Sequence, residues 1–193
     1  MTNRRNFIST TSAAAVSAAT HAFAAPADGD IKIALIGCGG RGTGACNQAL
    51  TAGSLIKLVA LVDPLEGKAQ AALDTLRQKH EGQVDVPPDQ VFANFEGYKQ
   101  AFELSDVVLI TTPPGPRPFL FEQAIKAGKH VFMEKPVATD AAGVRRVLAA
   151  AIALWAESAR RGKAEGSAML VRLRTTKEWG YAASEVDVRL VRA

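Results

Sequence analysis

The sequence predicts an α/β fold in which helices cover both faces of a doubly wound parallel sheet. Apolar runs of strand length alternate with helix-length segments from residue 31 to about residue 160. The runs are apolar throughout, which is typical of parallel strands that are buried on both faces. We expect five such strands, at residues 31–36, 56–62, 91–92, 106–110 and 130–133.

The segments between these runs have the end signals of helices. Gly128 directly follows one of them, and glycine is a common stop at a helix end. Thr139 and Asp140 precede an alanine-rich stretch, where a short polar side chain caps the first turn. We expect helices at residues 41–52, 65–80, 97–103, 118–127 and 141–160, and a polar loop at residues 81–89.

Composition and charge indicate a globular protein and argue against a nucleic-acid partner. Of the 193 residues, 48% are hydrophobic and 22% are charged, and the formal net charge is +4. Part of this excess comes from Arg4 and Arg5, in a leader without acidic residues. We find no basic face with interleaved aromatic residues and no histidine or cysteine cluster with metal-ligand spacing. We interpret Cys38 and Cys46 as small packing residues.

Residues 1–25 resemble a twin-arginine (Tat) export signal. Arg4 and Arg5 precede a weakly apolar run at residues 13–19, and an Ala-Phe-Ala sequence follows, as a signal peptidase requires. The run is too short and too rich in alanine and serine to form a stable membrane span. We therefore expect a periplasmic or secreted protein; a disordered basic leader is the alternative.

A glycine-rich loop joins the first expected strand to the first expected helix. Residues 37–42 read Gly-Cys-Gly-Gly-Arg-Gly, which fits G-x-G-x-x-G. The pattern is weak alone, but its place between a strand and a helix is the context of a dinucleotide-binding loop. Gly37 would make the tight turn, Gly39 would let the backbone approach a pyrophosphate, and Gly42 would let the helix pack closely. The N–H groups of the helix N-terminus would then face the phosphates.

Asp63 ends the second expected strand, 21 residues after Gly42. A carboxylate at this place accepts hydrogen bonds from the ribose hydroxyls of an adenosine and disfavours the 2′-phosphate of NADP. The sequence therefore predicts NAD as the cofactor, with NADP less favoured. The alternative is a tight strand-to-helix turn with an unrelated aspartate.

A more specific signature stands at residues 128–136, which read Gly-Lys-His-Val-Phe-Met-Glu-Lys-Pro. This strand with its Glu-Lys-Pro ending resembles the Gfo/Idh/MocA oxidoreductase family. The glycine loop, Val-Asp-Pro at 62–64 and Thr-Pro-Pro at 112–114 occur in the family's order. The resemblance covers about residues 31–155, the NAD(P)-binding Rossmann half of a family member, and the leader resembles those of exported members.

The resemblance implies roles for several residues of this chain. Thr112, Pro113 and Pro114 would line the cofactor near its ribose and nicotinamide. Lys135 would be the catalytic residue, because its ammonium would hydrogen-bond the reacting hydroxyl; a solvated lysine is the alternative. Glu134 would hold that lysine or the nicotinamide ribose. The predicted cofactor-binding residues are thus Gly37, Gly39, Gly40, Arg41, Gly42, Asp63, Thr112, Pro113, Pro114, Glu134 and Lys135.

The chain departs from the family's pattern in two ways. The family often has a histidine after the Thr-Pro-Pro turn, and residues 117–121 contain none. Members also continue into a second domain, often with a catalytic histidine, and no histidine follows Lys135 here. We expect a dinucleotide-binding domain at residues 30–155 and a remnant at 156–193, with one strand near 167–173. The second domain would be absent or vestigial, as in a truncated or frame-shifted reading of a longer gene or in a short nucleotide-binding protein.

Two functional classes follow from these observations. The first is an NAD-dependent oxidoreductase that takes hydride from a sugar or polyol. The second is a cofactor-binding module without turnover, because hydride transfer needs a held substrate and a base, and the cofactor half alone supplies neither in full. An uncovered apolar sheet face would favour self-association, so a homo-oligomer is a further expectation.

Replacing Arg4 and Arg5 by lysine is expected to trap the full-length precursor in the cytoplasm, because the Tat pathway selects the paired arginines. Fractionation and immunoblotting of a tagged chain measure the effect, and the unchanged leader is the control. Undiminished export of the double variant would contradict the assignment.

Overall fold

The computed structural model of the chain describes residues 29–65, 67–160, 167–176 and 183–192, and from residue 155 on it describes the backbone alone. The predicted export signal at residues 1–25 lies outside the described residues. Within the described part, no helix is both long enough and apolar enough to cross a membrane.

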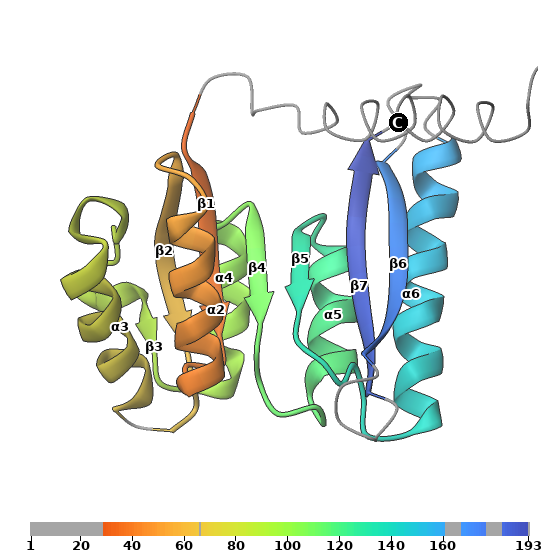
Figure 1. The fold of residues 1–193 in the computed structure, drawn as a ribbon, viewed down its shortest axis with the longest axis horizontal. Helices are drawn as coiled ribbons and strands as arrows, with labels where there is room; N and C mark the ends of the chain where they lie inside the picture. The colour runs from red at the N-terminus through yellow and green to blue at the C-terminus, as the bar shows by residue number, and fades with distance from the viewer. Residues whose placement is uncertain (1–28, 66, 161–166, 177–182, 193) are drawn as a thin grey trace, which may run out of the picture.

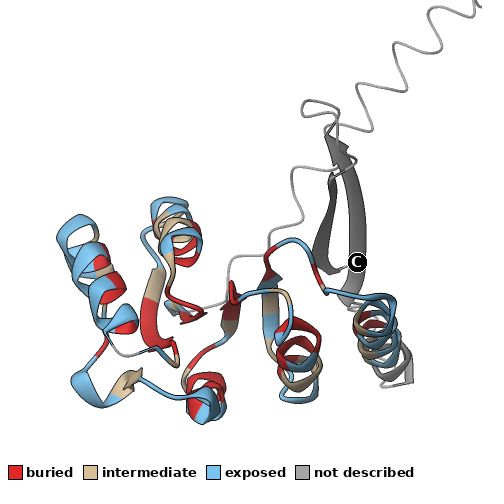
Figure 2. Cartoon of the chain, turned by 90° about the horizontal axis from the view of Figure 1, so that it is seen from below, coloured by how far each residue is buried: buried red, intermediate tan, exposed pale blue. Residues whose placement is uncertain are grey.

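Five parallel strands form the central sheet in the order β3-β2-β1-β4-β5 (Figure 1). Helices α2 and α3 cover one face, and α4, α5 and α6 pack on the other (Figure 2). The predicted doubly wound fold is therefore confirmed. The strands are β1 (Ile31–Ile36), β2 (Ile56–Val62), β3 (Val91–Phe92), β4 (Val107–Ile110) and β5 (His130–Met133), and the helices are α2 (Gly40–Thr51), α3 (Lys68–Lys79), α4 (Tyr98–Leu104), α5 (Arg117–Lys126) and α6 (Ala141–Arg160).

Two hydrophobic cores, one on each face, hold the helices on the sheet. Successive side chains of a strand point to opposite faces. Ile33 and Leu35 of β1 accordingly join the core under α2 and α3, whereas Ala34 and Ile36 join the core under α4, α5 and α6. Because both faces are buried, the strand has to be apolar at every position, and this is the pattern that the sequence shows.

The predicted helix ends at Gly128 and Asp140 are confirmed. Gly128 has φ +69° just after α5, a conformation that a residue without a Cβ adopts at little cost. The Asp140 carboxylate accepts a 2.7 Å hydrogen bond from the N–H of Gly143, in the first turn of α6. One predicted boundary is wrong. The helix after β2 begins at Lys68 and not at residue 65, because Leu65 donates its N–H to the Asp63 side chain in a turn.

Both cysteines are buried free thiols, as expected for packing residues. Burial raises the pKa of Cys46 to about 12. Burial also raises the pKa of Cys38 to about 12, with a smaller contribution from the negative charge of Asp63. Both thiols therefore stay protonated at neutral pH. Among the described residues, no cluster of side chains could hold a metal ion.

The last described segments form an antiparallel hairpin of β6 (Ser167–Thr176) and β7 (Ala183–Arg192). The sequence predicts a strand near residues 167–173, and β6 confirms it. The second strand was not predicted. Whether residues 156–193 are a remnant of a larger domain stays a prediction.

Candidate cofactor-binding site

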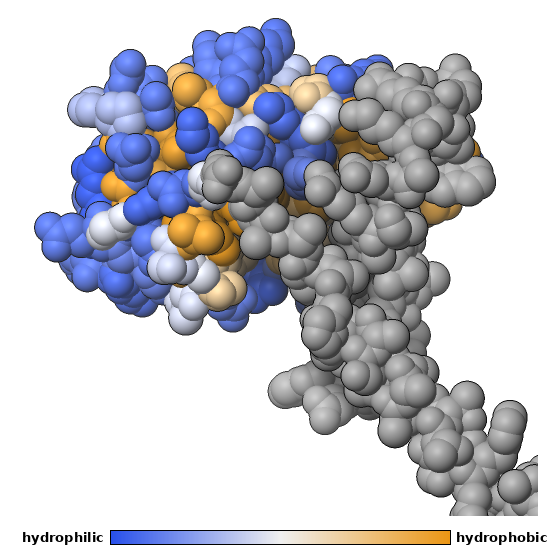
Figure 3. Space-filling view, turned by 90° about the horizontal axis from the view of Figure 1, so that it is seen from above, coloured by the Kyte–Doolittle hydropathy of each residue, from blue (hydrophilic) through white to orange (hydrophobic). Residues whose placement is uncertain are grey.

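The predicted site residues lie along one edge of the sheet, at the carboxyl ends of the strands. This edge faces the viewer in Figure 2, and the opposite edge, in Figure 3, presents mostly hydrophilic residues with apolar patches between them. Strand β1 lies between β2 and β4. From β1 the chain continues to β2 and β3 on one side, and then crosses to β4 and β5 on the other side. Such a switch point opens a crevice at the carboxyl ends, where ligands of open α/β sheets bind.

The glycine loop lies so close to the end of β4 that two of its glycines have no room for a side chain. A Cβ on Gly37 would lie 2.5 Å from the backbone nitrogen of Thr112, and Gly37 also has φ +96°. A Cβ on Gly42 would lie 2.0 Å from the carbonyl oxygen of Gly37. The Thr111 hydroxyl donates to the carbonyls of Ile36 (3.1 Å) and Gly37 (2.7 Å) and ties the same turn to β4. Gly37 and Gly42 are therefore required by the fold itself.

Gly39 and Gly40 differ, because a Cβ on either would meet no atom within 4 Å. Gly39 is the N-cap of α2 and offers no side chain to cap the helix, and the first turn holds no acidic residue. The first N–H groups of a helix lack partners within the helix and carry partial positive charge. The start of α2 therefore has the partial positive charge and the open space that an anion needs, and its binding of a pyrophosphate stays a prediction.

Asp63 lies at the end of β2 as predicted, but its carboxylate also holds the backbone together. One oxygen accepts from the N–H of Cys38 and the other from the N–H of Leu65, both at 2.9 Å. The side chain is buried. A carboxylate has about four acceptor positions, so capacity for ribose hydroxyls remains. This loop-fixing role was missed because it joins residues 25 positions apart.

The end of β4 contributes a buried hydroxyl that has no partner. Among the described residues, Thr112 Oγ1 is the buried side-chain oxygen without a hydrogen bond. A buried, unsatisfied hydroxyl costs about 1–3 kcal/mol, and a ligand that bonds to it recovers this energy. Pro113 beside it is exposed and Pro114 half-buried. The residues present thus fit a polar ligand that crosses from the start of α2 to the end of β4.

Glu134 and Arg41 form an ion pair between the end of β5 and the start of α2. Arg41 Nε donates to Glu134 Oε1 at 2.8 Å, and the carboxylate is almost fully buried. The second carboxylate oxygen lies 3.3 Å from the backbone nitrogen of Lys135. The resemblance implies that Glu134 holds Lys135 or the ribose; in this structure it pairs with Arg41 and reaches only the main chain of Lys135. Lys135 is exposed and precedes a cis peptide bond to Pro136.

Arg117 is a residue of the site that sequence reasoning missed. Its guanidinium is buried and donates to the carbonyls of Thr112 (2.7 Å), Glu134 (2.9 Å) and Pro136 (2.5 Å). Burial lowers the pKa of Arg117 from its usual value, and the negative charge of Glu134 opposes this shift. One signal existed in the sequence: an arginine in the first turn of a helix is placed against the helix dipole.

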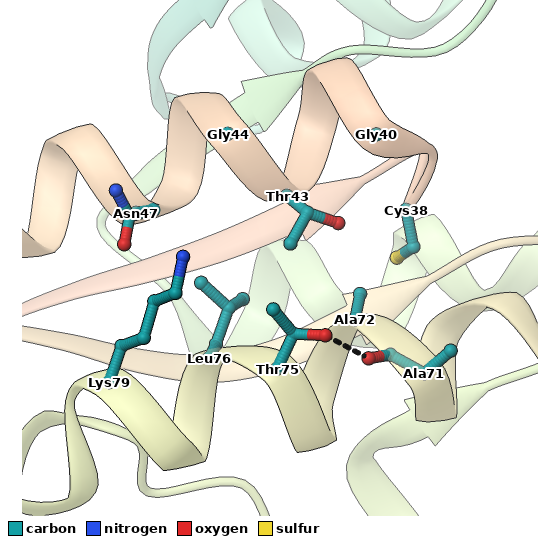
Figure 4. Close-up of a pocket in the computed structure, with 10 residues that line it drawn as sticks. All are labelled: Cys38, Gly40, Thr43, Gly44, Asn47, Ala71, Ala72, Thr75, Leu76 and Lys79. Carbon is teal, nitrogen blue, oxygen red and sulfur yellow. Dashed lines mark hydrogen bonds between the residues drawn. The ribbon is translucent and has the colours of Figure 1, made fainter.

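A pocket of about 390 Å³ lies beside the glycine loop, between α2 and α3 (Figure 4). Cys38 and Gly40 are at one end, and Asn47 and Lys79 are at the other. The pocket shares Gly40 with the predicted site but not Asp63 or the residues that follow β4 and β5. Its lining residues are Cys38, Gly40, Thr43, Gly44, Asn47, Ala71, Ala72, Thr75, Leu76 and Lys79.

Comparison with known protein families assigns this chain to a family. Residues 31–154 match the oxidoreductase family with an NAD-binding Rossmann fold, the Gfo/Idh/MocA family. The chain belongs to this family. The predicted family resemblance and dinucleotide-binding Rossmann domain are thereby confirmed, and the predicted NAD cofactor agrees with the family's description.

Solved structures resemble this Gfo/Idh/MocA chain over about two thirds of its length. The WlbA dehydrogenase of Chromobacterium violaceum, solved with NADH and UDP-GlcNAcA, is 26% identical over 66% of this chain, with TM-score 0.50. Apo scyllo-inositol dehydrogenase of Lactobacillus casei is 26% identical over 65%, with TM-score 0.51. The myo-inositol dehydrogenase of Lactobacillus casei, solved with NAD(H) and myo-inositol, shares the fold at 20% identity over 64% and TM-score 0.53.

In each case the matched part is 34% of the relative's own chain. This chain therefore spans about a third of the length of these solved relatives. A search of the curated proteins finds no match.

The glycines of the loop give a prediction that separates folding from binding. Gly39→Val is expected to lower the unfolding free energy by only about 1 kcal/mol, the cost of a poorer N-cap residue, since the added Cβ meets open space. The same side chain would occupy the place of the pyrophosphate and abolish NADH binding. Gly42→Ala is expected to lose about 2 kcal/mol or more, because its Cβ collides with backbone.

Gly44→Ala is the matched control, because it adds a methyl group to the same helix in open space. Urea denaturation and NADH fluorescence titration measure stability and binding for each variant. Normal NADH affinity in folded Gly39→Val would contradict the assigned place of the pyrophosphate.

Proposed function

We propose that this chain binds NAD(H) at the carboxyl edge of its sheet and serves as the cofactor domain of an oxidoreductase that acts on a sugar or polyol. The observation that carries the proposal is the open N-terminus of α2, beside the buried, unsatisfied Thr112 hydroxyl, at the switch point between β1 and β4. A ligand that binds both the start of α2 and the Thr112 hydroxyl needs an anionic group and a nearby polar group. A dinucleotide offers these as its pyrophosphate and its nicotinamide ribose.

Each part of the edge would hold a different part of the cofactor. The N–H groups at the start of α2 bind the pyrophosphate, and Asp63 accepts from the adenosine ribose with the acceptor positions that Cys38 and Leu65 leave open. Thr112 bonds to the ribose on the nicotinamide side, flanked by Pro113 and Pro114. When bound, NAD supplies the site that accepts hydride from a substrate carbon.

Lys135 is the residue that we propose for the chemical step. Its side chain is exposed at the end of β5, and Glu134 beside it is committed to Arg41. The Lys135 ammonium would donate a hydrogen bond to the substrate hydroxyl and stabilise the negative charge that develops on this oxygen while its proton passes to solvent water. The exposed ammonium is therefore free to meet a substrate above the crevice.

The substrate class rests on the relatives. Dehydrogenases of inositols and of a UDP-linked sugar acid are among the solved structures that resemble this domain. Membership in an oxidoreductase family favours this reading over a cofactor-binding module without turnover. Export by the Tat pathway and assembly into a homo-oligomer are further proposals, which subcellular fractionation and light scattering test.

The chain is expected to bind NADH at least about tenfold more tightly than NADPH, because a carboxylate beside the 2′-phosphate costs about one to a few kcal/mol. Asp63→Asn keeps the shape of the side chain but removes its charge and replaces one of its two acceptor oxygens by an NH2 donor, so it should narrow this preference and also loosen the turn that Asp63 holds. Fluorescence titration with both reduced cofactors gives the ratio. Asp85→Asn removes an exposed carboxylate elsewhere and is the control. Equal affinities in the parent chain would contradict the role of Asp63.

A further inference from the structure

The buried guanidinium of Arg117 joins the two loops that carry the predicted cofactor and catalytic residues. Its Nε bonds to the carbonyl of Thr112, after β4. One terminal nitrogen bonds to the carbonyls of Glu134 and Pro136, after β5. These last two residues are the neighbours of Lys135 on either side, so the backbone of Lys135 is held at both ends.

The burial of the Arg117 guanidinium costs free energy, which its hydrogen bonds have to offset. Burying a cation costs several kcal/mol unless it is paired and hydrogen-bonded. Within the described residues, Arg117 donates to main-chain carbonyls, and the nearby charge of Glu134 is itself paired with Arg41. Arg117 also stands in the first turn of α5, where the helix dipole disfavours a cation.

An arginine suits this place better than a lysine. The planar guanidinium carries five N–H donors in a fixed fork, so one side chain reaches two separate loops with defined geometry. A lysine ammonium is a compact point charge on a flexible stem, and it would reach one loop well or both poorly. Within the described part of the chain, the hydrogen bonds around Lys135 hold its backbone and not its exposed ammonium.

We infer that Arg117 is a positioning residue, which sets Thr112 and Lys135 at the distance that the nicotinamide half of the cofactor requires. The inference rests on the proposed function. The inference distinguishes the nicotinamide half of the site, at Thr112 and Lys135, from the adenosine and pyrophosphate half, at Asp63 and the start of α2. Within the described residues, Arg117 makes no direct hydrogen bond to Asp63 and reaches the start of α2 only through Glu134, so we expect the adenosine and pyrophosphate contacts to depend on it less.

The test compares a ligand that uses both halves with one that uses only the first. Arg117→Met and Arg117→Lys are titrated with NADH and with ADP by calorimetry, and thermal unfolding is followed in parallel. Arg146→Met is the control, because it removes an exposed arginine from α6. We expect Arg117→Met to weaken NADH about tenfold and ADP less than twofold, and Arg117→Lys to recover part of the NADH affinity.

A second measurement reads Lys135 directly. Mass spectrometry follows the rate at which an amine-reactive reagent acetylates Lys135. In the parent chain, NADH should slow this acetylation. The slowing should disappear in Arg117→Met and return in part in Arg117→Lys. Equal losses of NADH and ADP binding, unchanged affinities, or failure of both variants to fold would show a purely structural role or none and overturn the inference. A parent chain that binds neither NADH nor ADP would instead overturn the proposed function. Titration of the unsubstituted chain alone gives this result, so the two failures are distinguishable.

Discussion

The close contact between the glycine loop and the end of β4 is the constraint on which the rest of the site depends. Gly37 and Gly42 let the turn lie against Thr111 and Thr112, at distances where any side chain would collide with backbone. This approach brings the N-terminus of α2 to the switch point of the sheet. Thr112 lies at this contact, and its hydroxyl is buried and lacks a partner within the described residues. The open start of α2 and an unsatisfied hydroxyl thus come together at one edge of the sheet through packing alone.

Buried charges fix the loops around this contact. Asp63 holds the glycine loop to the turn after β2, Glu134 holds the start of α2 to the end of β5, and Arg117 holds the ends of β4 and β5 together. Each charge is costly to bury, and each is satisfied mainly by main-chain groups or by one ion pair. The loops at the carboxyl edge of the sheet are therefore cross-linked where a ligand would lie, and preorganised donors favour binding and catalysis.

Much of this arrangement could be predicted from local sequence patterns. The strands follow from continuous apolar runs, the glycine loop from its place between a strand and a helix, and Asp63 from its spacing. The bonds between distant side chains could not. Arg41 and Glu134 are 93 positions apart, and the link of Arg117 to Glu134 depends on side-chain directions that a single sequence does not encode. The dual role of Asp63 was missed for the same reason, because Cys38 meets it only after β1 and β2 pair.

The central claim is that a dinucleotide lies across the carboxyl ends of β1, β2, β4 and β5. Amide chemical shifts of the nitrogen-15-labelled chain, recorded during titration with NADH, test it most directly. The account predicts that the largest changes fall on the glycine loop, on Thr112 and on Lys135, and that the far end of the α2–α3 pocket, at Asn47 and Lys79, stays unchanged. Changes concentrated at Asn47 and Lys79, with the ends of β4 and β5 unaffected, would contradict the account.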